Sequence, residues 1–248
     1  MPIYFASDFH LGIKSTVPKK EREKIVCDWL DSIHSDAEAL YLLGDIFDYW
    51  FEYDQVVPKG NVRLLSRLAS LCDKGVDVHL FTGNHDMWMF GYLEEEIGLT
   101  LHKQPISVEL NGKKFFMGHG DGLGPGDRAF KLVKKLFGSS LNQWLFARIH
   151  PNTGLRIMKF FSRKSRETED AILKFQGADK EWLILFAEEH CKKDYHDFYL
   201  FGHRHLPIDF TLSNGVSRYI NTGDWIHHFS YAELNDNTLE LKVFDKGE

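Results

Sequence analysis

Leu40-Tyr41-Leu42-Leu43-Gly44-Asp45 joins an apolar run of β-strand type directly to a glycine and a carboxylate. The arrangement recurs along the chain, where short apolar runs lead into Asp8-Phe9-His10, Gly83-Asn84-His85-Asp86, Gly118-His119-Gly120-Asp121 and Gly202-His203-Arg204-His205. Strands of an α/β sheet deliver the residues at their ends to one edge, where such folds usually keep their sites. We therefore expect the five blocks to form one site, made of side chains that bind metal ions.

Helix-like segments separate the first three strands. Lys19–His34 and Val62–Cys72 carry apolar residues near helical spacing, and they lie between the strands Ile3–Ala6, Leu40–Leu43 and Val76–Phe81. This β-α-β-α-β order implies parallel strands joined by crossover helices.

The rest of the pattern predicts hairpins. Asn111-Gly112, a strong turn signal, joins Ile106–Leu110 to Lys114–Met117. Two more hairpins pair Ile208–Leu212 with Val216–Ile220 and Tyr231–Leu234 with Thr238–Phe244. We predict one domain over residues 1–248 of the mixed α/β (α+β) class, with a two-layer mixed sheet flanked by helices.

Residues 127–180 differ from the rest of the chain. Aromatic and aliphatic residues alternate there with lysines and arginines, inside a protein that is otherwise acidic. The stretch lies between two of the site blocks, so we interpret it as a helical insertion that caps the site. A lid with an apolar chamber and a basic rim would suit an acylated, phosphorylated substrate or a membrane surface. Ordinary amphipathic core helices with a solvated basic face are the alternative.

Composition limits the function classes. The chain has 248 residues, 43% of them apolar, which suffices for a core, and its net charge of −6 gives no general attraction to nucleic acid. Cys27, Cys72 and Cys191 are odd in number and widely spaced, which is typical of core thiols in a reducing compartment. The first strand begins at once, which leaves no room for a signal peptide, and no apolar run is long enough to span a bilayer. We expect a cytoplasmic protein.

The side chains of the blocks supply oxygen and nitrogen ligands but no thiolates, a set that suits Mn²⁺, Fe or Zn²⁺. The candidates are too many for one ion and fit two, with Asp45 as a bridge: Asp8, His10, Asp45, Asn84, His119, His203 and His205.

The ordered series of blocks resembles the calcineurin-like metallophosphoesterase superfamily over nearly the whole chain. The resemblance implies a sandwich of two mixed sheets with helices outside, and two metal sites that share Asp45. One site would add Asp8, His10 and His205, and the other would add Asn84, His119 and His203. His85 would protonate the leaving group, Asp86 could orient it, and Asp48 resembles a carboxylate that holds a histidine ligand. A pure positioning role for His85 is the alternative.

A narrower resemblance is to the UDP-2,3-diacylglucosamine hydrolases of lipid A biosynthesis. The segments that carry it are Leu42–Phe51, His119–Leu123, the helical insertion, Gly202–Pro207 and Asn221–Trp225. The resemblance implies Mn²⁺-dependent cleavage of the pyrophosphate of UDP-2,3-diacylglucosamine to UMP and 2,3-diacylglucosamine 1-phosphate, with the insertion as a lid over the acyl chains. One departure is His85, where well-known members carry arginine, a residue that can grip phosphate in a bidentate way.

Four basic or acidic residues of the insertion are candidates for contact with sugar or phosphate: Asp127, Arg128, Lys164 and Arg166. Each could equally be a solvated charge. Contact with the inner membrane would be peripheral at most, through the basic and aromatic helices.

Two other functions remain open at this point. The chain could be a metal-dependent phosphodiesterase or phosphatase for a soluble nucleotide, with the insertion as part of the core. It could also be a non-catalytic scaffold, although scaffolds of this kind lose metal ligands and none of the expected ligands is missing here.

Overall fold

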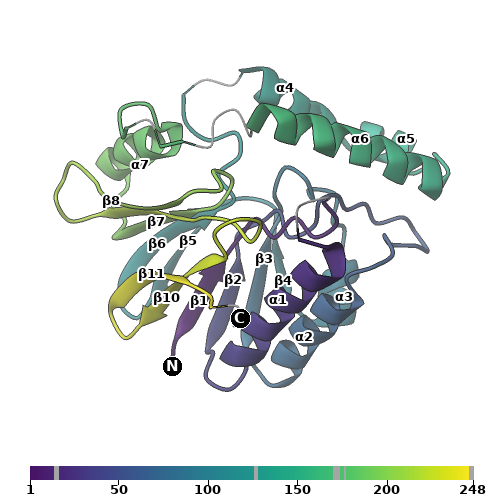
Figure 1. The fold of residues 1–248 in the computed structure, drawn as a ribbon. Helices are drawn as coiled ribbons and strands as arrows, with labels where there is room; N and C mark the ends of the chain where they lie inside the picture. The colour runs from purple at the N-terminus through teal and green to yellow at the C-terminus, as the bar shows by residue number, and fades with distance from the viewer. Residues whose placement is uncertain (14–16, 126–127, 170–173, 176, 246–248) are drawn as a thin grey trace.

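The computed structural model describes residues 1–13, 17–125, 128–169, 174–175 and 177–245, without the side chains of 128–130, 132–133 and 165–169. Two mixed sheets face each other in the described part (Figure 1). The first sheet has the order β11 (Thr238–Val243), β10 (Ser230–Asn235), β1 (Ile3–Ala6), β2 (Ala39–Leu42), β3 (Asp77–Phe81) and β4 (Thr100–His102). The second has the order β5 (Ile106–Leu110), β6 (Lys113–Gly118), β7 (Phe198–Phe201), β9 (Arg218–Thr222) and β8 (Pro207–Thr211).

Parallel pairing in the middle of both sheets sets the position of the site. Strands β1, β2, β3 and β4 are parallel neighbours, and so are β6, β7 and β9. The hairpin strands β5, β8, β10 and β11 add antiparallel pairs at the edges. The carboxyl ends of β1, β2, β3, β6 and β7 therefore lie at one common edge.

Strands β1, β2 and β7 are apolar or aromatic throughout because both of their faces are buried. In β1, Ile3 and Phe5 point into the core between the sheets, whereas Tyr4 and Ala6 point to the core under the outer helices. Successive strand residues point to opposite faces, so a continuous apolar run fills two cores at once. Phe5 stacks on Phe115 of the second sheet at 5.9 Å between ring centroids, which joins the two layers.

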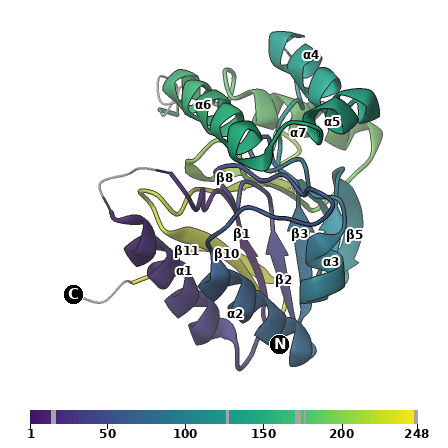
Figure 2. The same ribbon diagram turned by 90° about the vertical axis from the view of Figure 1, so that its right-hand side faces the viewer.

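Helices cover the outer faces of the sandwich. The first sheet carries α1 (Lys19–Ile33), α2 (Val62–Asp73) and the short α3 (Tyr92–Ile97), and the second carries α7 (Trp182–Lys193) (Figures 1 and 2). Trp29 of α1 and Leu68 of α2 are fully buried against the first sheet, and Leu183 of α7 packs on the second. The order of layers is helix, sheet, sheet, helix.

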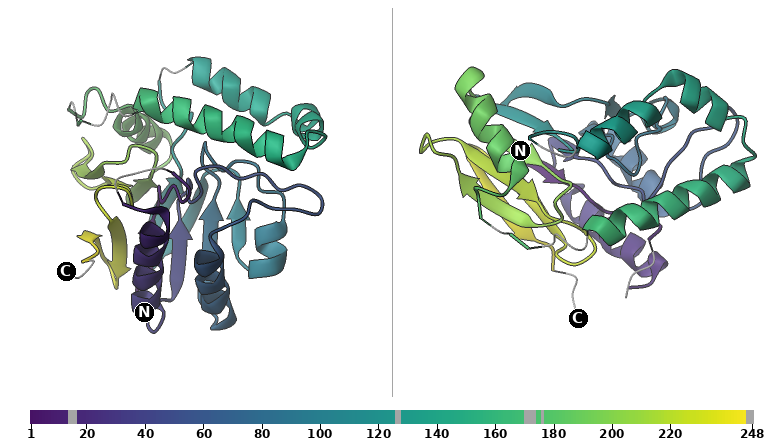
Figure 3. Two further views of the ribbon diagram at one scale, coloured as in Figure 1. Left: turned by 45° about the vertical axis from the view of Figure 1, so that its right-hand side comes forward. Right: turned by 90° about the horizontal axis from the view of Figure 1, so that it is seen from above.

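A separate group of helices lies across the edge where the site blocks end (Figures 1 and 3). It consists of α4 (Arg128–Phe137), α5 (Ser140–Phe146) and α6 (Pro151–Glu169), which we call the cap helices. Trp88 anchors them to the sandwich, because its Nε1 donates to the carbonyl of Phe137 at 2.8 Å and its ring lies 4.7 Å from that of Phe146. Among the described residues, none of the helices combines the length and the apolar content that crossing a bilayer requires.

The predicted mixed sandwich with flanking helices is confirmed, and the three expected hairpins are present with ends displaced by one or two residues. Three elements were not predicted. Strand β4 and helix α3 are short, with three and six residues, so neither shows a full period in the sequence. Helix α7 buries Leu183, Ile184 and Ala187, a helical spacing that the sequence analysis left unassigned.

Candidate metal centre

The strand ends bring the predicted ligands together. Asp8, His10 and His205, whose positions are separated by up to 197 residues, offer ligand atoms within 4.8 Å of one another. Nε2 of His10 lies 3.1 Å from Nε2 of His205, and Oδ1 of Asp8 lies 3.3 Å from the same His205 nitrogen. All three residues are buried. They form the first half of the centre.

The second half forms around the amide oxygen of Asn84, which follows β3. This oxygen lies 2.9 Å from Nε2 of His119 and 3.0 Å from Nδ1 of His203. Nδ1 of His119 lies 2.8 Å from the carbonyl oxygen of Leu43, which fixes the ring so that Nε2 faces the centre.

Asp45 lies between the two halves. Its Oδ2 is 3.6 Å from Nε2 of His10 in the first half and 3.3 Å from Nε2 of His119 in the second. Oδ1 accepts the backbone N–H of His85 at 2.8 Å, so the other oxygen is held toward the histidines. This is the arrangement expected of a bridging carboxylate.

The electrostatics of the centre fit divalent cations. Within the described residues, Oδ1 of Asp8 and Oδ2 of Asp45 are buried and accept no hydrogen bond, although buried carboxylate oxygens are normally paired. Burial alone would raise the pKa of Asp45 and lower that of His119, yet their mutual attraction reverses both shifts and holds the carboxylate charged. Buried, charged, unpaired oxygens facing histidine nitrogens are the donor set of an oxygen–nitrogen metal site.

The backbone of the centre is strained at the ligands. Five of the seven predicted ligands have positive φ, a conformation that L-residues rarely adopt: Asp8 (56°), His10 (43°), Asp45 (53°), His203 (67°) and His205 (53°). Strain of this kind persists at functional sites, where the surrounding structure fixes it. Arg22 of α1 provides part of that support, because its buried guanidinium donates to the carbonyls of Phe9 (2.5 Å) and His10 (2.8 Å).

Two glycines of the blocks are needed for close approach. A Cβ on Gly83 would overlap Oδ1 of Asp45 and lie 2.6 Å from its backbone nitrogen. A Cβ on Gly202 would lie 2.5 Å from Oδ2 of Asp8. The glycines therefore let neighbouring strand ends come close enough for their ligands to meet.

His85 lies beside the ligands and is oriented by two contacts. Its Nδ1 lies 3.2 Å from the carbonyl oxygen of Asp48 and 3.1 Å from Oγ of Ser162, a residue of α6. A carbonyl can only accept, so we assign the hydrogen to Nδ1. The ring stands edge-on to that of His10 with 4.7 Å between centroids, and Nε2 is the atom left for acid–base chemistry.

Asp86 differs from its predicted place beside His85. Its carboxylate accepts the backbone N–H groups of Gly83 (2.8 Å), Ile46 (2.8 Å) and Phe47 (3.2 Å), and no described contact joins it to the His85 ring. The expectation that Asp86 orients His85 is therefore wrong. Residues 84–86 form a bend after β3, and this bend directs the Asp86 carboxylate to the backbone N–H groups of the neighbouring loops. Its role is to hold the loops after β2 and β3 together.

Asp224 and Ser162 are functional neighbours that the sequence analysis did not assign. Oδ2 of Asp224 lies 3.4 Å from Nδ1 of His205, the carboxylate–histidine pairing that orients metal ligands. Its Oδ1 accepts the backbone N–H groups of His227 and His228. Asp224 lies within the Asn221–Trp225 segment, whose resemblance to the hydrolases could have marked it as a site residue. No sequence pattern marks Ser162, because only the fold brings α6 to His85.

The four candidates for substrate contact lie in or next to the cap helices. Lys164 is exposed on α6 and lines the pocket described next. Arg128 and Arg166 belong to α4 and α6, but their side chains, like Asp127 as a whole, lie outside the described residues.

A large apolar pocket lies between the cap helices and the centre. Its volume is about 620 Å³, and it opens on Asn84 and His85. We call it the apolar pocket; its walls come from the sandwich and all three cap helices, namely Tyr49, Met87, Trp88, Lys134, Leu136, Phe137, Phe146, Ile157, Met158, Phe161, Ser162 and Lys164.

Comparison with known proteins identifies the class. The family model of calcineurin-like phosphoesterases matches residues 1–207. The chain belongs to the calcineurin-like phosphoesterase family and is a metal-dependent hydrolase. A solved archaeal phosphodiesterase shares the fold, with a TM-score of 0.50 at 13% identity, over 98% of this chain and 100% of that one.

Among curated relatives, the chain is 40% identical to the UDP-2,3-diacylglucosamine hydrolase of Porphyromonas gingivalis, over 99% of this chain and 98% of the relative. It is 28% identical to the UDP-2,3-diacylglucosamine hydrolase of Hahella chejuensis, over 97% of this chain and 96% of the relative. The family predicted from the sequence blocks is therefore confirmed.

Proposed function

We propose that the protein hydrolyses the pyrophosphate bond of UDP-2,3-diacylglucosamine, giving UMP and 2,3-diacylglucosamine 1-phosphate. The observation that carries the proposal is the apolar pocket of about 620 Å³ that opens on Asn84 and His85. A soluble nucleotide has no apolar group of that size, whereas acyl chains do. The full-length similarity to UDP-2,3-diacylglucosamine hydrolases supports the same substrate.

The donor set fits two divalent cations, and Mn²⁺ is our choice because Asp8, Asp45 and Asn84 supply the carboxylate and amide oxygens that suit it; the four histidines are donors that also suit Zn²⁺ or Fe. Asp8, His10 and His205 would hold one ion, Asn84, His119 and His203 the other, and Asp45 both. When bound, such ions supply an activated water near neutral pH and neutralise charge on phosphoryl oxygens.

The protein's own residues complete the reaction. One P–O bond of the pyrophosphate breaks as the oxygen of water joins phosphorus, and the departing phosphate oxygen needs a proton. The doubly protonated form of His85 supplies it from Nε2 and keeps the hydrogen on Nδ1, which is held by Asp48 and Ser162. Trp88 and Phe146, whose rings lie 4.7 Å apart, belong to the apolar wall of the pocket that also contains Asn84 and His85.

Peripheral contact with a membrane surface is part of the proposal, since the lipid substrate must enter beneath the cap helices. Leu141, Trp144 and Leu145 are exposed on α5. The guanidinium of Arg148 lies 4.8 Å from the Trp144 ring centre, which places a cation beside the apolar residues. Amphipathic surfaces with this composition bind anionic lipid without inserting deeply.

The test compares UDP-2,3-diacylglucosamine with a soluble UDP-sugar, both with Mn²⁺. Phe161 lines the apolar pocket, and its neighbour Phe160 does not, although their exposed fractions are similar at 51% and 55%. Phe161→Gln should raise KM for the lipid about tenfold and leave hydrolysis of a chromogenic phosphodiester unchanged, while Phe160→Gln changes neither reaction. Turnover of soluble nucleotides alone would refute the lipid assignment.

A further inference from the structure

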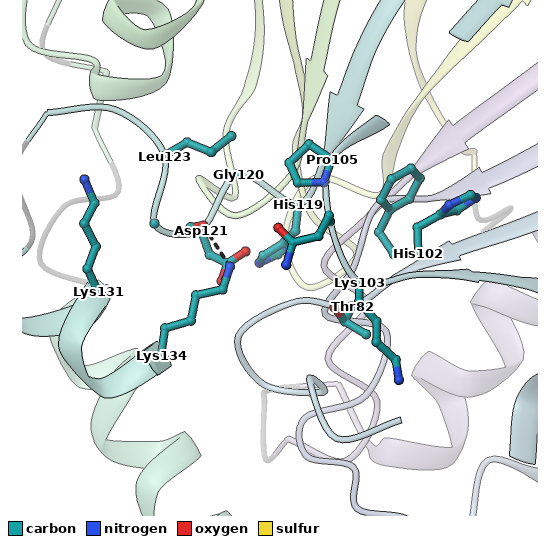
Figure 4. A pocket seen from close by; sticks show the side chains of 13 residues that line it. Thr82, His102, Lys103, Pro105, His119, Gly120, Asp121, Leu123, Lys131 and Lys134 are labelled. Carbon is teal, nitrogen blue, oxygen red and sulfur yellow. Dashed lines mark hydrogen bonds and ion pairs between the residues drawn. The ribbon is translucent and has the colours of Figure 1, made fainter. Parts of the chain in front are cut away.

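A second, smaller pocket lies beside His119, one of the predicted metal ligands (Figure 4). Its volume is about 230 Å³, less than half that of the apolar pocket. Lys131 and Lys134 line it from α4, with the Lys134 side chain directed at Asp121, while Thr82, Lys103 and Pro105 lie on the facing side and His119 lies between them (Figure 4). We call it the polar pocket.

The charge of the polar pocket favours an anion. Three lysines line it, Lys103, Lys131 and Lys134, against one carboxylate, that of Asp121. Asp121 is already paired, because Nζ of Lys134 lies 2.5 Å from its Oδ2 and donates to its carbonyl at 3.1 Å. Lys103 and Lys131 are exposed at the rim; Nζ of Lys131 donates to the carbonyl of Gly124 at 2.7 Å, and Nζ of Lys103 lies 5.7 Å from the Phe90 ring centre. Both side chains would turn from these contacts to meet an incoming phosphate.

The uncharged part of the wall suits a nucleoside. Thr82 and Gln104 offer a hydroxyl and an amide, which can pair with both the N–H and the carbonyl groups of a pyrimidine. Phe81, Pro105 and Leu123 provide flat or aliphatic surface for the faces of the base and sugar. The volume is too small for two acyl chains, and the wall is too polar for them.

The two pockets meet at the metal centre. Asn84 lines the apolar pocket and His119 lines the polar one, and the Asn84 amide oxygen is 2.9 Å from Nε2 of His119. Lys134 lines both pockets. A molecule with a lipid half and a nucleotide half would therefore place its linking diphosphate across these ligands and beside Lys134.

We infer that the polar pocket binds the nucleoside monophosphate half of the substrate, with the phosphate toward His119 and the pyrimidine nucleoside against Thr82 and Gln104. The inference rests on the proposed function, because it divides a nucleotide–lipid substrate between two pockets of unlike chemistry. It also explains why the second pocket opens on the same ligands as the first.

The probe is UMP, and its binding to the Mn²⁺-loaded protein is measured by calorimetry. Lys131 and Lys135 are both exposed on α4, but only Lys131 lines the polar pocket. Lys131→Glu should weaken UMP binding about tenfold, whereas Lys135→Glu, which changes the net charge equally, should leave it within about twofold. Gln104→Ala should weaken UMP binding and leave the binding of inorganic phosphate unchanged, because it touches the nucleoside.

The outcomes separate the two proposals. If UDP-2,3-diacylglucosamine is hydrolysed but UMP binding is the same in Lys131→Glu, Gln104→Ala and the unmodified protein, the polar pocket is not the nucleotide site. The same conclusion follows if UMP binds no more tightly than inorganic phosphate. If the lipid is not turned over but UMP binding depends on Gln104 and Lys131, the pocket stands and the proposed function falls.

Discussion

Oγ of Ser162 lies 3.1 Å from Nδ1 of His85 and donates to Oδ1 of Asp48 at 2.7 Å. Ser162 belongs to α6, so a cap helix directly contacts the group that we propose protonates the leaving oxygen. The hydroxyl gives its hydrogen to the Asp48 carboxylate and can accept one from the imidazole. The helix that we propose to lie over an acylated substrate therefore also orients His85.

Ser162→Ala should lower kcat about three- to tenfold with little change in KM, because one hydrogen bond that orients His85 is lost while the apolar pocket keeps its shape. Ser162→Thr retains the hydroxyl and should restore most of the loss. Steady-state kinetics on UDP-2,3-diacylglucosamine measure both. Equal activity of the alanine and threonine variants would show that the hydroxyl does not act on His85.

His85→Ala should lower kcat by about 10²–10⁴-fold on the natural pyrophosphate, the usual contribution of a general acid. A phosphodiester with an alkoxide leaving group, a far stronger base than phosphate, depends more on the proton, so its hydrolysis should fall at least as much. Because His85 also lies within 4.8 Å of ligand atoms of His10 and Asp45, metal content must be measured in the same samples. An unchanged Mn²⁺ content separates the acid role from a ligand role; loss of metal would assign His85 to the centre itself.

The fold could be predicted from the sequence because its central strands are buried on both faces. Such strands are continuous apolar runs that are easy to recognise. The polar blocks that follow them contain Asp, His and Asn residues, which indicate a functional site. β4 was missed because its three residues, Thr100–His102, gain their strand character from pairing with β3 rather than from any pattern of their own. Local sequence carries little information about an edge strand of that length.

The candidate metal ligands could be proposed from the sequence for a different reason: chemistry restricts the residue types that bind metal ions. The residues that orient them are not restricted in this way. Ser162 is 77 residues from His85, and a serine on an amphipathic helix has no signature until α6 is placed over the centre. Asp86 was expected beside the His85 ring because the two residues are adjacent in sequence, whereas the bend at residues 84–86 directs the Asp86 carboxylate to backbone N–H groups instead.

Asp224→Asn should weaken Mn²⁺ binding by about 10–100-fold, the usual effect of removing the carboxylate that orients a histidine ligand. Calorimetric titration of the metal-free protein measures it. His228→Gln is the matched control, because His228 contacts the other oxygen of Asp224 and lies away from His205. A metal affinity lowered equally by both variants would indicate a general effect on folding.

The contact between Asp224 and His228 predicts how the stability of the metal-free protein depends on pH. Burial opposes the charge of Asp224, but hydrogen bonds from His205 and His228 lower its pKa. The contribution of the Asp224 carboxylate to the free energy of unfolding is therefore present above its ordinary pKa of 3.8 and is lost as pH falls. Hydrogen bonding to Asp224 raises the pKa of His228, so that contribution is present below 6.5 and is lost as pH rises further. The destabilisation by Asp224→Asn, measured by urea unfolding, should therefore be largest between pH 3.8 and 6.5.

Gly83→Ala should abolish tight metal binding, because the new Cβ would occupy the space of Oδ1 of Asp45 and displace the carboxylate that joins the two halves of the centre. Gly112→Ala is the control for backbone strain. Gly112 has a positive φ of 71° but open space around it, so alanine there should cost about 1 kcal/mol in stability and leave metal binding unchanged. Urea unfolding and metal content, measured for both variants, distinguish the two effects. The contrary result would be a Gly83→Ala variant that is no less stable than Gly112→Ala and still binds both ions. It would show that the position of Asp45 does not depend on the absence of a Cβ at residue 83.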